Sequence, residues 1–356
     1  LYCGYTAGLD ATGKAIGLPQ DKRKLTTGKA LIRYFCVPCK PTKTNGNRTW
    51  NLPKHAPEKW VLFKDYCKQD VITEYEILKR LEQYPVPEEE EFLWQMDIRM
   101  NAYGVRVDEE LINGALAIDA ISSENLTMEA IDITGLGNPN STSQLKVWIE
   151  KQISGEISGL TKENVTELLS RSDISDEVRR VLEIRQQLGK TSIKKYVAMK
   201  TAEGEGERVR GLTQFYGANR TGRWAGRLVQ MQNLPRNYLK TLDEARKLAK
   251  AKNYEGVRLI YENVPDTLSQ LIRTAFIPSE GQKFVVADFS AIEARVIAWL
   301  AGEQWVNEVF ATLGNIYEAT ASQMFHVPIE KIAKGNPEYS LRQKGKVATL
   351  ALGYQG

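Results

Sequence analysis

The sequence predicts a multidomain α/β and α+β protein. Its 356 residues, 42% hydrophobic and 26% charged, are enough for two or three domains that each bury a core. A proline-containing break lies at residues 84–87, and an acidic, glycine-rich link lies at 203–207. The residues between them form the middle third of the chain and have the hydrophobic spacing of helices. Beyond Gly211, a β-branched run followed by an amphipathic helix indicates strand–helix architecture.

The first 104 residues alternate between loops and helices. Residues 38–57 are rich in Pro, Lys, Thr and Asn, which is typical of a loop, and a helix is predicted over Asp65–Arg80. After the break at 84–87, a second helix carries Glu88–Glu91 in its first turn, where the helix dipole favours acidic side chains. We expect Gly104 to end that helix.

Helices are predicted throughout residues 109–200, after a short strand at 105–107. The segment Ser141–Gln144 fits a capping box, in which the two side chains bond the helix's first backbone N–H groups. Thr161 and Ser175 each precede an apolar pattern with helical spacing.

Cysteine usage fits a reducing cytoplasm, because four cysteines are too few for a disulfide framework. Cys36 and Cys39 form a C-x-x-C pair, but a zinc site needs a second pair or histidines, and the chain has only two histidines. We expect two ordinary thiols, with a structural zinc as the alternative. No run of about 18 apolar residues occurs, so no membrane-spanning helix is expected.

Positive charge gathers in residues 208–252, which hold eleven Lys and Arg against two acidic residues. Such an excess suits a phosphate backbone, and a solvated basic face is the alternative. Within it, Thr221 and Arg223 precede Gln232 and Asn233. Arg, Gln and Asn can donate to the minor-groove acceptors that every base pair presents, whereas an ordinary surface loop is the alternative.

The clearest motif is FVVADFSAIEARVIAWLAGE at residues 284–303. A buried strand over Lys283–Ala287 would hold the carboxylate of Asp288 at a strand tip, where metal sites are built. The helix that follows carries Glu293 and Arg295. The alternative is an aspartate that only caps this helix.

A helix predicted from about Leu341 places four side chains at intervals of four residues. Because one turn takes 3.6 residues, they form a single, slightly spiralling stripe. Two cations at one end can hold a triphosphate, and the apolar and aromatic groups at the other can stack on a base and sugar. An ordinary helix face is the alternative. The four residues are Arg342, Lys346, Leu350 and Tyr354.

Together and in this order, these segments resemble the family A DNA polymerases, in a phage-like form. DFSAIEAR (288–295) is similar to the family's motif A, RQKGKVATLALGYQG (342–356) to its motif B, and TGRWAGRLVQMQNLP (221–235) to its primer–template minor-groove motif. LSQLIRTAFIP (268–278) fits the segment before motif A. The likeness covers nearly the whole chain and is weakest at 109–200 and the N-terminus.

The resemblance extends upstream. Tyr66-x-x-x-Asp70 is similar to the third motif of the linked 3′–5′ exonuclease, where the aspartate holds a metal and the tyrosine orients the attacking water. A surface pair on a helix is the alternative. Residues 97–108 and 138–145 resemble the thumb entry and the duplex-gripping thumb region. The lysines that this implies near phosphates are Lys190, Lys194 and Lys195.

The resemblance implies a right-hand polymerase in four parts. These are the C-terminal part of an RNase H-like exonuclease domain (1–84), a helical thumb (85–210), a palm with motif A (211–303) and the start of the fingers with the motif B helix (304–356).

The implied reaction is attack of a primer 3′-OH on the α-phosphate of a dNTP, with two Mg²⁺ ions in the polymerase site. Asp288 then binds both metals with help from the Phe289 carbonyl, and Asp70 is the exonuclease ligand. Arg342 and Lys346 neutralise the triphosphate, and Lys346 can protonate the leaving pyrophosphate. The remaining implied substrate contacts are Glu293 at the sugar 2′ position and Leu350 and Tyr354 at the nascent pair.

Two departures bear on nucleotide discrimination: Leu350 stands where the family usually has Phe or Tyr, and Tyr354 is followed by Gln-Gly. The family's second palm carboxylate and first two exonuclease motifs have no match in the chain. We therefore expect an internal fragment that binds DNA but is itself inactive.

Two alternatives remain, a single-subunit RNA polymerase, against which Glu293 argues, and a non-catalytic primer–template-binding protein. Expected partners are primer–template DNA and dNTPs, with no membrane. A C-terminal fragment or a processivity factor is a further candidate partner. The expected location is the cytoplasm, that of a bacterial host if a phage encodes the chain.

Overall fold

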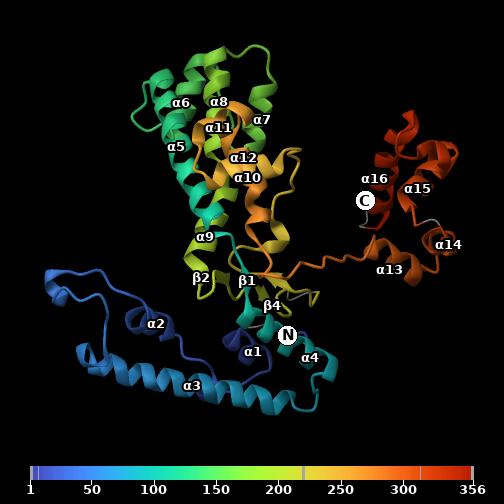
Figure 1. Ribbon diagram of the computed structural model, residues 1–356. Helices are drawn as coiled ribbons and strands as arrows, with labels where there is room; N and C mark the ends of the chain where they lie inside the picture. Colours follow the sequence, from blue (N-terminus) through green and yellow to red (C-terminus); the bar gives the residue numbers. More distant parts are fainter. Residues whose placement is uncertain (1–2, 7, 219–220, 313, 354–356) are drawn as a thin grey trace. The chain divides into compact units, whose positions relative to one another are not determined.

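The computed structural model describes residues 3–6, 8–218, 221–312 and 314–353. Contacts divide the chain into two compact units, unit 1 (Leu1–Gln282) and unit 2 (Lys283–Gly356), which are described separately. Helices dominate both units, and each described strand is two residues long (Figure 1). No described helix is both long and apolar enough to cross a membrane.

The N-terminal part of unit 1 is built on one long helix, α3, which begins at Pro57 rather than at the predicted Asp65. Proline suits the first helical position because its missing N–H would have no partner there. Tyr66 of α3 packs with Leu31 and Phe35 of α2. The elements are α1 (Leu9–Ala15), η1 (Gln20–Lys22), α2 (Gly28–Cys36), η2 (Lys43–Asn45), η3 (Pro53–His55), α3 (Pro57–Leu81) and α4 (Glu88–Tyr103).

The predicted glycine-rich link at 203–207 lies at a hairpin. Its strands β2 (Glu203–Gly204) and β3 (Arg208–Val209) pair antiparallel, and β3 also pairs with β1 (Val105–Arg106), in the order β1-β3-β2. The short strand predicted near residue 105 is therefore confirmed. A second antiparallel pair joins β4 (Thr213–Gln214) to β5 (Ala225–Gly226).

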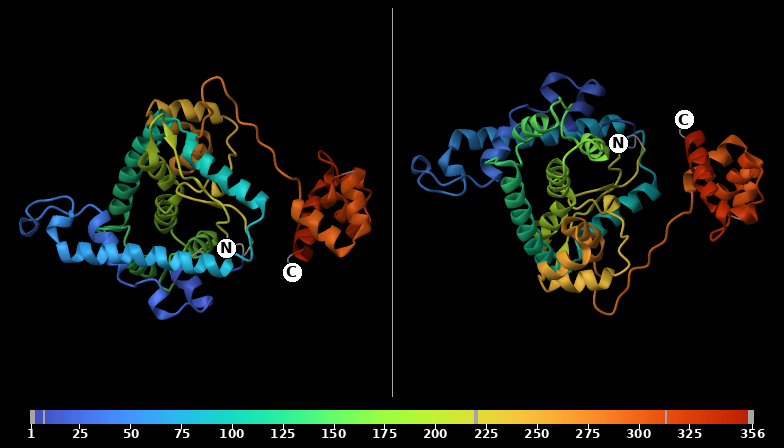
Figure 2. Two further views of the ribbon diagram at one scale, coloured as in Figure 1. Left: turned by 90° about the horizontal axis from the view of Figure 1, so that it is seen from below. Right: turned by 90° about the horizontal axis from the view of Figure 1, so that it is seen from above.

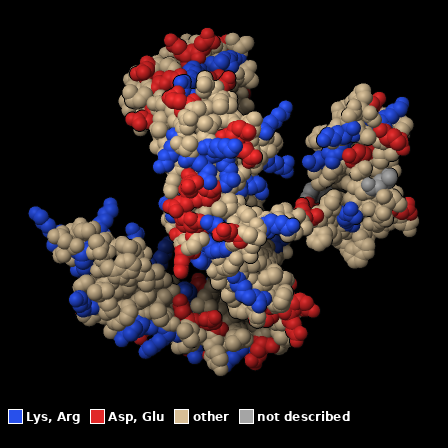
Figure 3. Space-filling model, in the orientation of Figure 1, with Lys and Arg blue, Asp and Glu red and all other residues tan. Residues whose placement is uncertain are grey.

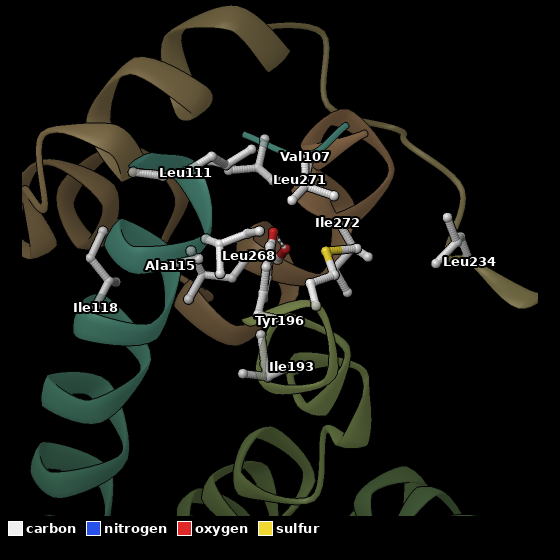
Figure 4. Packing of buried hydrophobic residues seen from close by; sticks show 14 of the residues in the cluster. Val107, Leu111, Ala115, Ile118, Ile193, Tyr196, Leu234, Leu268, Leu271 and Ile272 are labelled. Carbon is white, nitrogen blue, oxygen red and sulfur yellow. Dashed lines mark hydrogen bonds between the residues drawn. The ribbon is translucent and has the colours of Figure 1, made fainter. Parts of the chain in front are cut away.

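The main core of unit 1 lies where α5, α9, α10 and α12 meet (Figure 4). Tyr196 is fully buried there, and its hydroxyl donates to the Leu268 carbonyl at 2.8 Å. Burial raises the pKa of this phenol, so it stays neutral. The elements are α5 (Glu109–Thr134), η4 (Thr191–Ile193), α9 (Lys194–Ala202), η5 (Met231–Asn233), α10 (Leu242–Lys250), α11 (Tyr254–Tyr261), α12 (Val264–Leu271) and η6 (Ile272–Ala275).

A second core joins α6 (Thr142–Ile153), α7 (Lys162–Ser170) and α8 (Asp176–Leu188). Thr161 and Ser175 cap α7 and α8 through their hydroxyl oxygens, which confirms those helix starts. The capping box at Ser141–Gln144 is wrong: α6 begins at Thr142, but the Ser141 hydroxyl lies 3.1 Å from that of Ser143 and does not cap the helix.

Unit 2 is a small bundle of helices (Figure 2). The buried strand predicted over Lys283–Ala287 is wrong, because these residues have no regular secondary structure, and Val285 and Val286 are 85% and 90% exposed. A strand requires a neighbour for its backbone groups, and no described segment pairs with this one. The elements are α13 (Ile292–Ala301), α14 (Gln304–Thr312), α15 (Ile316–Phe325), η7 (Ile329–Ile332), η8 (Pro337–Ser340) and α16 (Leu341–Gly353).

Candidate functional site

The predicted cationic stripe lies on α16, which packs closely against α15. Gly345 makes this approach possible, because a Cβ there would stand 2.1 Å from the Tyr317 carbonyl oxygen. Arg342 donates from Nε to Glu318 Oε1 at 2.7 Å, and its guanidinium faces the ring of Tyr317. The hydrogen bond to Glu318 raises the pKa of Arg342.

The other stripe residues follow on the same helix. Lys346 and Leu350 are half-buried on α16, so the helical spacing predicted from Arg342 to Leu350 is confirmed. Tyr354 lies outside the described residues.

Glu293 and Leu350 line one hollow of about 300 Å³ in unit 2. Its wall is mostly apolar and comes from helices α13 to α16, including Trp305, Ile316 and Thr349. The structure therefore brings together two residues that lie 57 positions apart in the sequence and were both predicted to contact a nucleotide. Such a concave, mostly apolar wall with the carboxylates of Glu293 and Glu303 at it can accept a sugar or base and test its shape.

Asp288 and Phe289 lie in the segment that precedes α13, and Phe289 is 78% exposed. Asp288 is exposed as well. Among the described residues, no group of three or more His, Cys, Asp or Glu side chains is placed to hold a metal ion. The carboxylates of the described residues therefore do not form a two-metal site by themselves. The C-x-x-C pair Cys36 and Cys39 consists of free thiols.

The predicted minor-groove residues lie on the surface of unit 1. Thr221, Arg223, Gln232 and Asn233 are exposed, with Arg223 just before β5 and the two amides on η5. Gly226 of β5 lets the Gln232 side chain lie against the hairpin, because a Cβ there would meet Gln232 Oε1 at 2.1 Å. This places all four residues around one hairpin.

Several cations of the basic stretch form hydrogen bonds or ion pairs within unit 1. Arg208 donates to the Gly104 carbonyl and Arg210 to the Ala102 carbonyl, while Arg246 and Lys250 both pair with Asp108. The expected local excess of positive charge at the surface is reduced accordingly. Among the described residues, no acidic side chain pairs with the following cations of the stretch: Arg227, Arg236, Lys240, Lys247 and Lys252.

The three predicted thumb lysines differ in their surroundings. Lys190 pairs with Asp266, and Lys195 donates to the Val229 carbonyl at 2.6 Å. Burial lowers the pKa of Lys195. Lys194 begins α9 and has no acidic partner among the described residues.

Tyr66 and Asp70 lie together on α3, as their spacing predicted, and a third residue joins them. Lys24 donates to the Tyr66 hydroxyl at 2.8 Å and to Asp70 Oδ2 at 2.7 Å. Burial lowers the pKa of Lys24, but the hydrogen bonds to Asp70 and Tyr66 outweigh it and the pKa is raised. Asp70 Oδ1 is buried with no hydrogen-bond partner, so one acceptor remains available in this cluster.

Sequence reasoning missed Lys24 and Glu318, the ionic partners of Asp70 and Arg342. The partners lie 46 and 24 positions apart, respectively, so no helical or strand spacing relates them. Lys24 could have been noticed because it lies in a run of basic residues. Nothing in the sequence around Glu318 indicates that it pairs with Arg342.

Three comparisons identify the relatives of the chain. The model of "DNA polymerase family A" matches residues 119–355. The DNA polymerase of Bacillus phage SP02 is 57% identical over 353 residues, which cover 99% of this chain and 53% of that protein. The thermostable DNA polymerase I of Thermus aquaticus is 44% identical over 73 residues, which cover 20% of this chain and 9% of that protein.

A solved structure shares the fold. It is the POL domain of Pol1 from M. smegmatis in complex with DNA primer–template and dNTP, at 18% identity and a TM-score of 0.53, covering 96% of this chain and 53% of that one. The chain spans about half the length of the phage relative. The family match and the phage likeness confirm the predicted resemblance, and the chain belongs to DNA polymerase family A.

Proposed function

We propose that the whole protein is a DNA-directed DNA polymerase, which adds dNTPs to a primer 3′-OH on a DNA template. The observation that carries this is the hollow shared by Glu293 and Leu350, beside the helix that bears Arg342 and Lys346. Selecting a nucleotide requires cations for the triphosphate and a shaped wall for the sugar on adjoining elements. The M. smegmatis relative, in complex with primer–template and dNTP, supports the same partners.

We assign the chain four parts on the same grounds. Residues 1–84 would end a 3′–5′ exonuclease domain, 85–210 would form the thumb, 211–303 would belong to the palm and 304–356 would begin the fingers. The separate core of α6, α7 and α8 supports the thumb assignment, and the bundle of unit 2 supports the fingers.

On the nucleotide side, Arg342 and Lys346 would neutralise the triphosphate, with Lys346 placed to give a proton to the leaving pyrophosphate. Glu293 would occupy the space beside C2′ and so exclude a 2′-OH. Leu350 would pack on the sugar and Tyr354 on the nascent base pair. Glu318 would hold Arg342 in one direction before a triphosphate arrives.

Polymerases of family A use divalent metal ions, which lower the cost of charge at the transferred phosphoryl group. Asp288 would bind both metals with help from the Phe289 carbonyl, and the remaining ligands would come from outside the described residues, which hold no cluster of three or more such side chains. The exposure of Asp288 supports this, because the carboxylate is available to a metal and to ligands from elsewhere.

On the DNA side, Thr221, Arg223, Gln232 and Asn233 would follow the duplex minor groove, where their donors test pair geometry rather than sequence. Lys194 is the thumb lysine best able to meet a phosphate, because Lys190 and Lys195 are engaged inside unit 1.

The cluster of Lys24, Tyr66 and Asp70 would be what this chain contributes to a proofreading nuclease site. Lys24 donates to Asp70 Oδ2 and to the Tyr66 hydroxyl and so fixes both groups, which supports a role for the hydroxyl in orienting a water molecule.

The test is primer extension by the whole polymerase with Asp288→Asn, matched to Asp243→Asn on the exposed face of α10. Asp288→Asn should lower dNTP incorporation by about a hundredfold or more while primer–template binding persists, because only the metal ligand is lost. Asp243→Asn should leave both unchanged. Full activity of Asp288→Asn would contradict the assignment, and preferential use of rNTPs by the parent protein would favour an RNA polymerase.

A further inference from the structure

Residues 22–57 form the most one-sided charged segment of the chain. They contain nine Lys and Arg residues and no Asp or Glu. The segment lies outside residues 119–355, which the family model matches. Its cations near α3 are neutralised, because Lys22 pairs with Glu76 and Lys24 with Asp70. The remaining positive charge belongs to Arg23, which donates to the Leu18 carbonyl, to α2 and to residues 38–56, here called the basic loop.

The basic loop is held in one conformation by its own hydrogen bonds. Asn45 donates to the Lys40 carbonyl at 2.8 Å, and the Cys39 backbone N–H donates to the Thr49 carbonyl at 2.8 Å. Asn51 is 8% exposed and accepts from Arg48 Nε at 2.8 Å. The same amide donates to the Tyr34 carbonyl of α2, so the base of the loop is anchored. A ligand would meet a preorganised surface and pay little ordering entropy.

The cations of the basic loop point to solvent. Lys40, Lys43 and Lys54 are exposed, and no acidic side chain among the described residues pairs with them. Figure 3 shows Lys and Arg side chains projecting from the lobe at lower left, the region of this loop in Figure 1. Trp50, on the same loop, is 42% exposed and stacks on no described ring.

We propose that the basic loop binds a single strand of DNA, with its lysines on the phosphates and Trp50 stacked on a base. The charge selects a polyanion, because several unpaired cations without a single acid repel other cations and gain by releasing the counterions of a phosphate backbone. The exposed indole favours a single strand, because the bases of a duplex offer no open face for stacking. This binding site is separate from the polymerase residues of the proposed function and does not depend on them.

The first experiment is a fluorescence-anisotropy titration of the 356-residue chain with a labelled single-stranded oligonucleotide at several salt concentrations. Lys40→Glu/Lys43→Glu should weaken binding about tenfold or more at low salt and reduce the slope of log K against log salt by about 1.4, the effect of two lost phosphate contacts. The matched control is Lys331→Glu/Lys334→Glu in unit 2, two exposed lysines with the same spacing of three. Equal losses in both variants, or none in the loop variant, would overturn the proposal.

A second pair of variants separates stacking from charge. Trp50→Ala should weaken binding of the single strand about fivefold or more, whereas Trp50→Phe should keep most of the affinity because it keeps an aromatic face. A loss confined to blunt duplex DNA would overturn the choice of a single strand. In the whole polymerase, the loop variants should leave dNTP incorporation at saturating primer–template unchanged, which distinguishes failure here from failure of the polymerase assignment.

Discussion

Arg342 of α16 and Glu318 of α15 form an ion pair in which Nε donates to Oε1 at 2.7 Å. The Glu318 side chain is 15% exposed, so the pair is only partly screened by solvent. Gly345 brings the two helices close enough for this contact. The guanidinium keeps other N–H donors beyond the one that Glu318 accepts, and these can meet a phosphate. Glu318 is thus a positioning residue for the cation that we assign to the triphosphate.

Glu318→Ala in the whole polymerase should raise KM for dNTPs about fivefold to tenfold with a smaller change in kcat, because Arg342 loses its fixed direction. Steady-state kinetics on a primer–template measures both constants. Glu318→Gln should restore part of the loss through its remaining hydrogen-bond acceptor. Glu308→Ala, on the exposed part of α14, is the control and should change neither constant. A lower KM in Glu318→Ala would mean that the pair competes with the triphosphate.

Glu293→Ala should admit ribonucleotides, because it removes the carboxylate that shares a hollow with Leu350. The ratio of kcat/KM for dNTP over rNTP should fall about tenfold or more, since selectivity is a difference of transition-state energies. Single-nucleotide incorporation with each matched dNTP and rNTP gives the ratio. Glu303→Ala, another carboxylate at the same hollow, is the control for lost charge alone. If both variants change the ratio equally, Glu293 has no special place at the sugar.

Several helix boundaries could be predicted from the sequence, because caps and terminators act locally. Thr161 and Ser175 bond the first turns of their own helices, and Gly104, at φ +69°, ends α4 as its position suggested. The segment Lys283–Ala287 failed for the opposite reason. β-Branched residues favour a strand, but a strand exists only with a partner for its backbone, and that partner is not a local property of the sequence.

In the candidate site, too, the local features could be predicted and the long-range contacts could not. The stripe from Arg342 to Leu350 follows from helix geometry, so its spacing was enough to predict it. The contacts of Lys24 and Glu318 with their partners depend on how segments distant in the sequence pack together, and no sequence spacing predicts that packing. The same holds for the hollow, because Glu293 and Leu350 meet only when α13 and α16 share a bundle.

Asp108 should make the free energy of unfolding of unit 1 depend on pH in the acid range. Burial raises its pKa, but the Leu111 backbone N–H and then Lys250 and Arg246 outweigh this, so the pKa lies below the ordinary 3.8. Because the folded pKa is lowered, its contribution is full above the unfolded value and is lost as pH falls through the folded one. Asp108→Asn should cost about 1.5–3 kcal/mol at pH 7, and the difference should shrink below about pH 4.

Urea unfolding of Asp108→Asn and the parent chain across this pH range tests the point. Glu110→Gln is the matched control, since Glu110 binds the same Lys250 at 3.0 Å but is 78% exposed. It should cost about 0.5 kcal/mol or less, as exposed pairs do. A difference for Asp108→Asn that stays constant from pH 7 to pH 3 would show that the charge of Asp108 is not what stabilises the fold.

Gly114 sets how closely α5 approaches α10. A Cβ at this position would stand 1.9 Å from the Ala249 carbonyl oxygen, which is backbone and cannot rotate away. Alanine favours a helix over glycine by about 1 kcal/mol, but here the two helices must separate, and overpacking of this kind costs about 1–3 kcal/mol. Gly114→Ala should therefore lower the free energy of unfolding and speed hydrogen exchange in α5 and α10. Gly137→Ala, where no atom lies within 4 Å of the new Cβ, should stay within about 0.5 kcal/mol of the parent. Stabilisation by Gly114→Ala would mean that helix propensity outweighs the contact and that α10 can move.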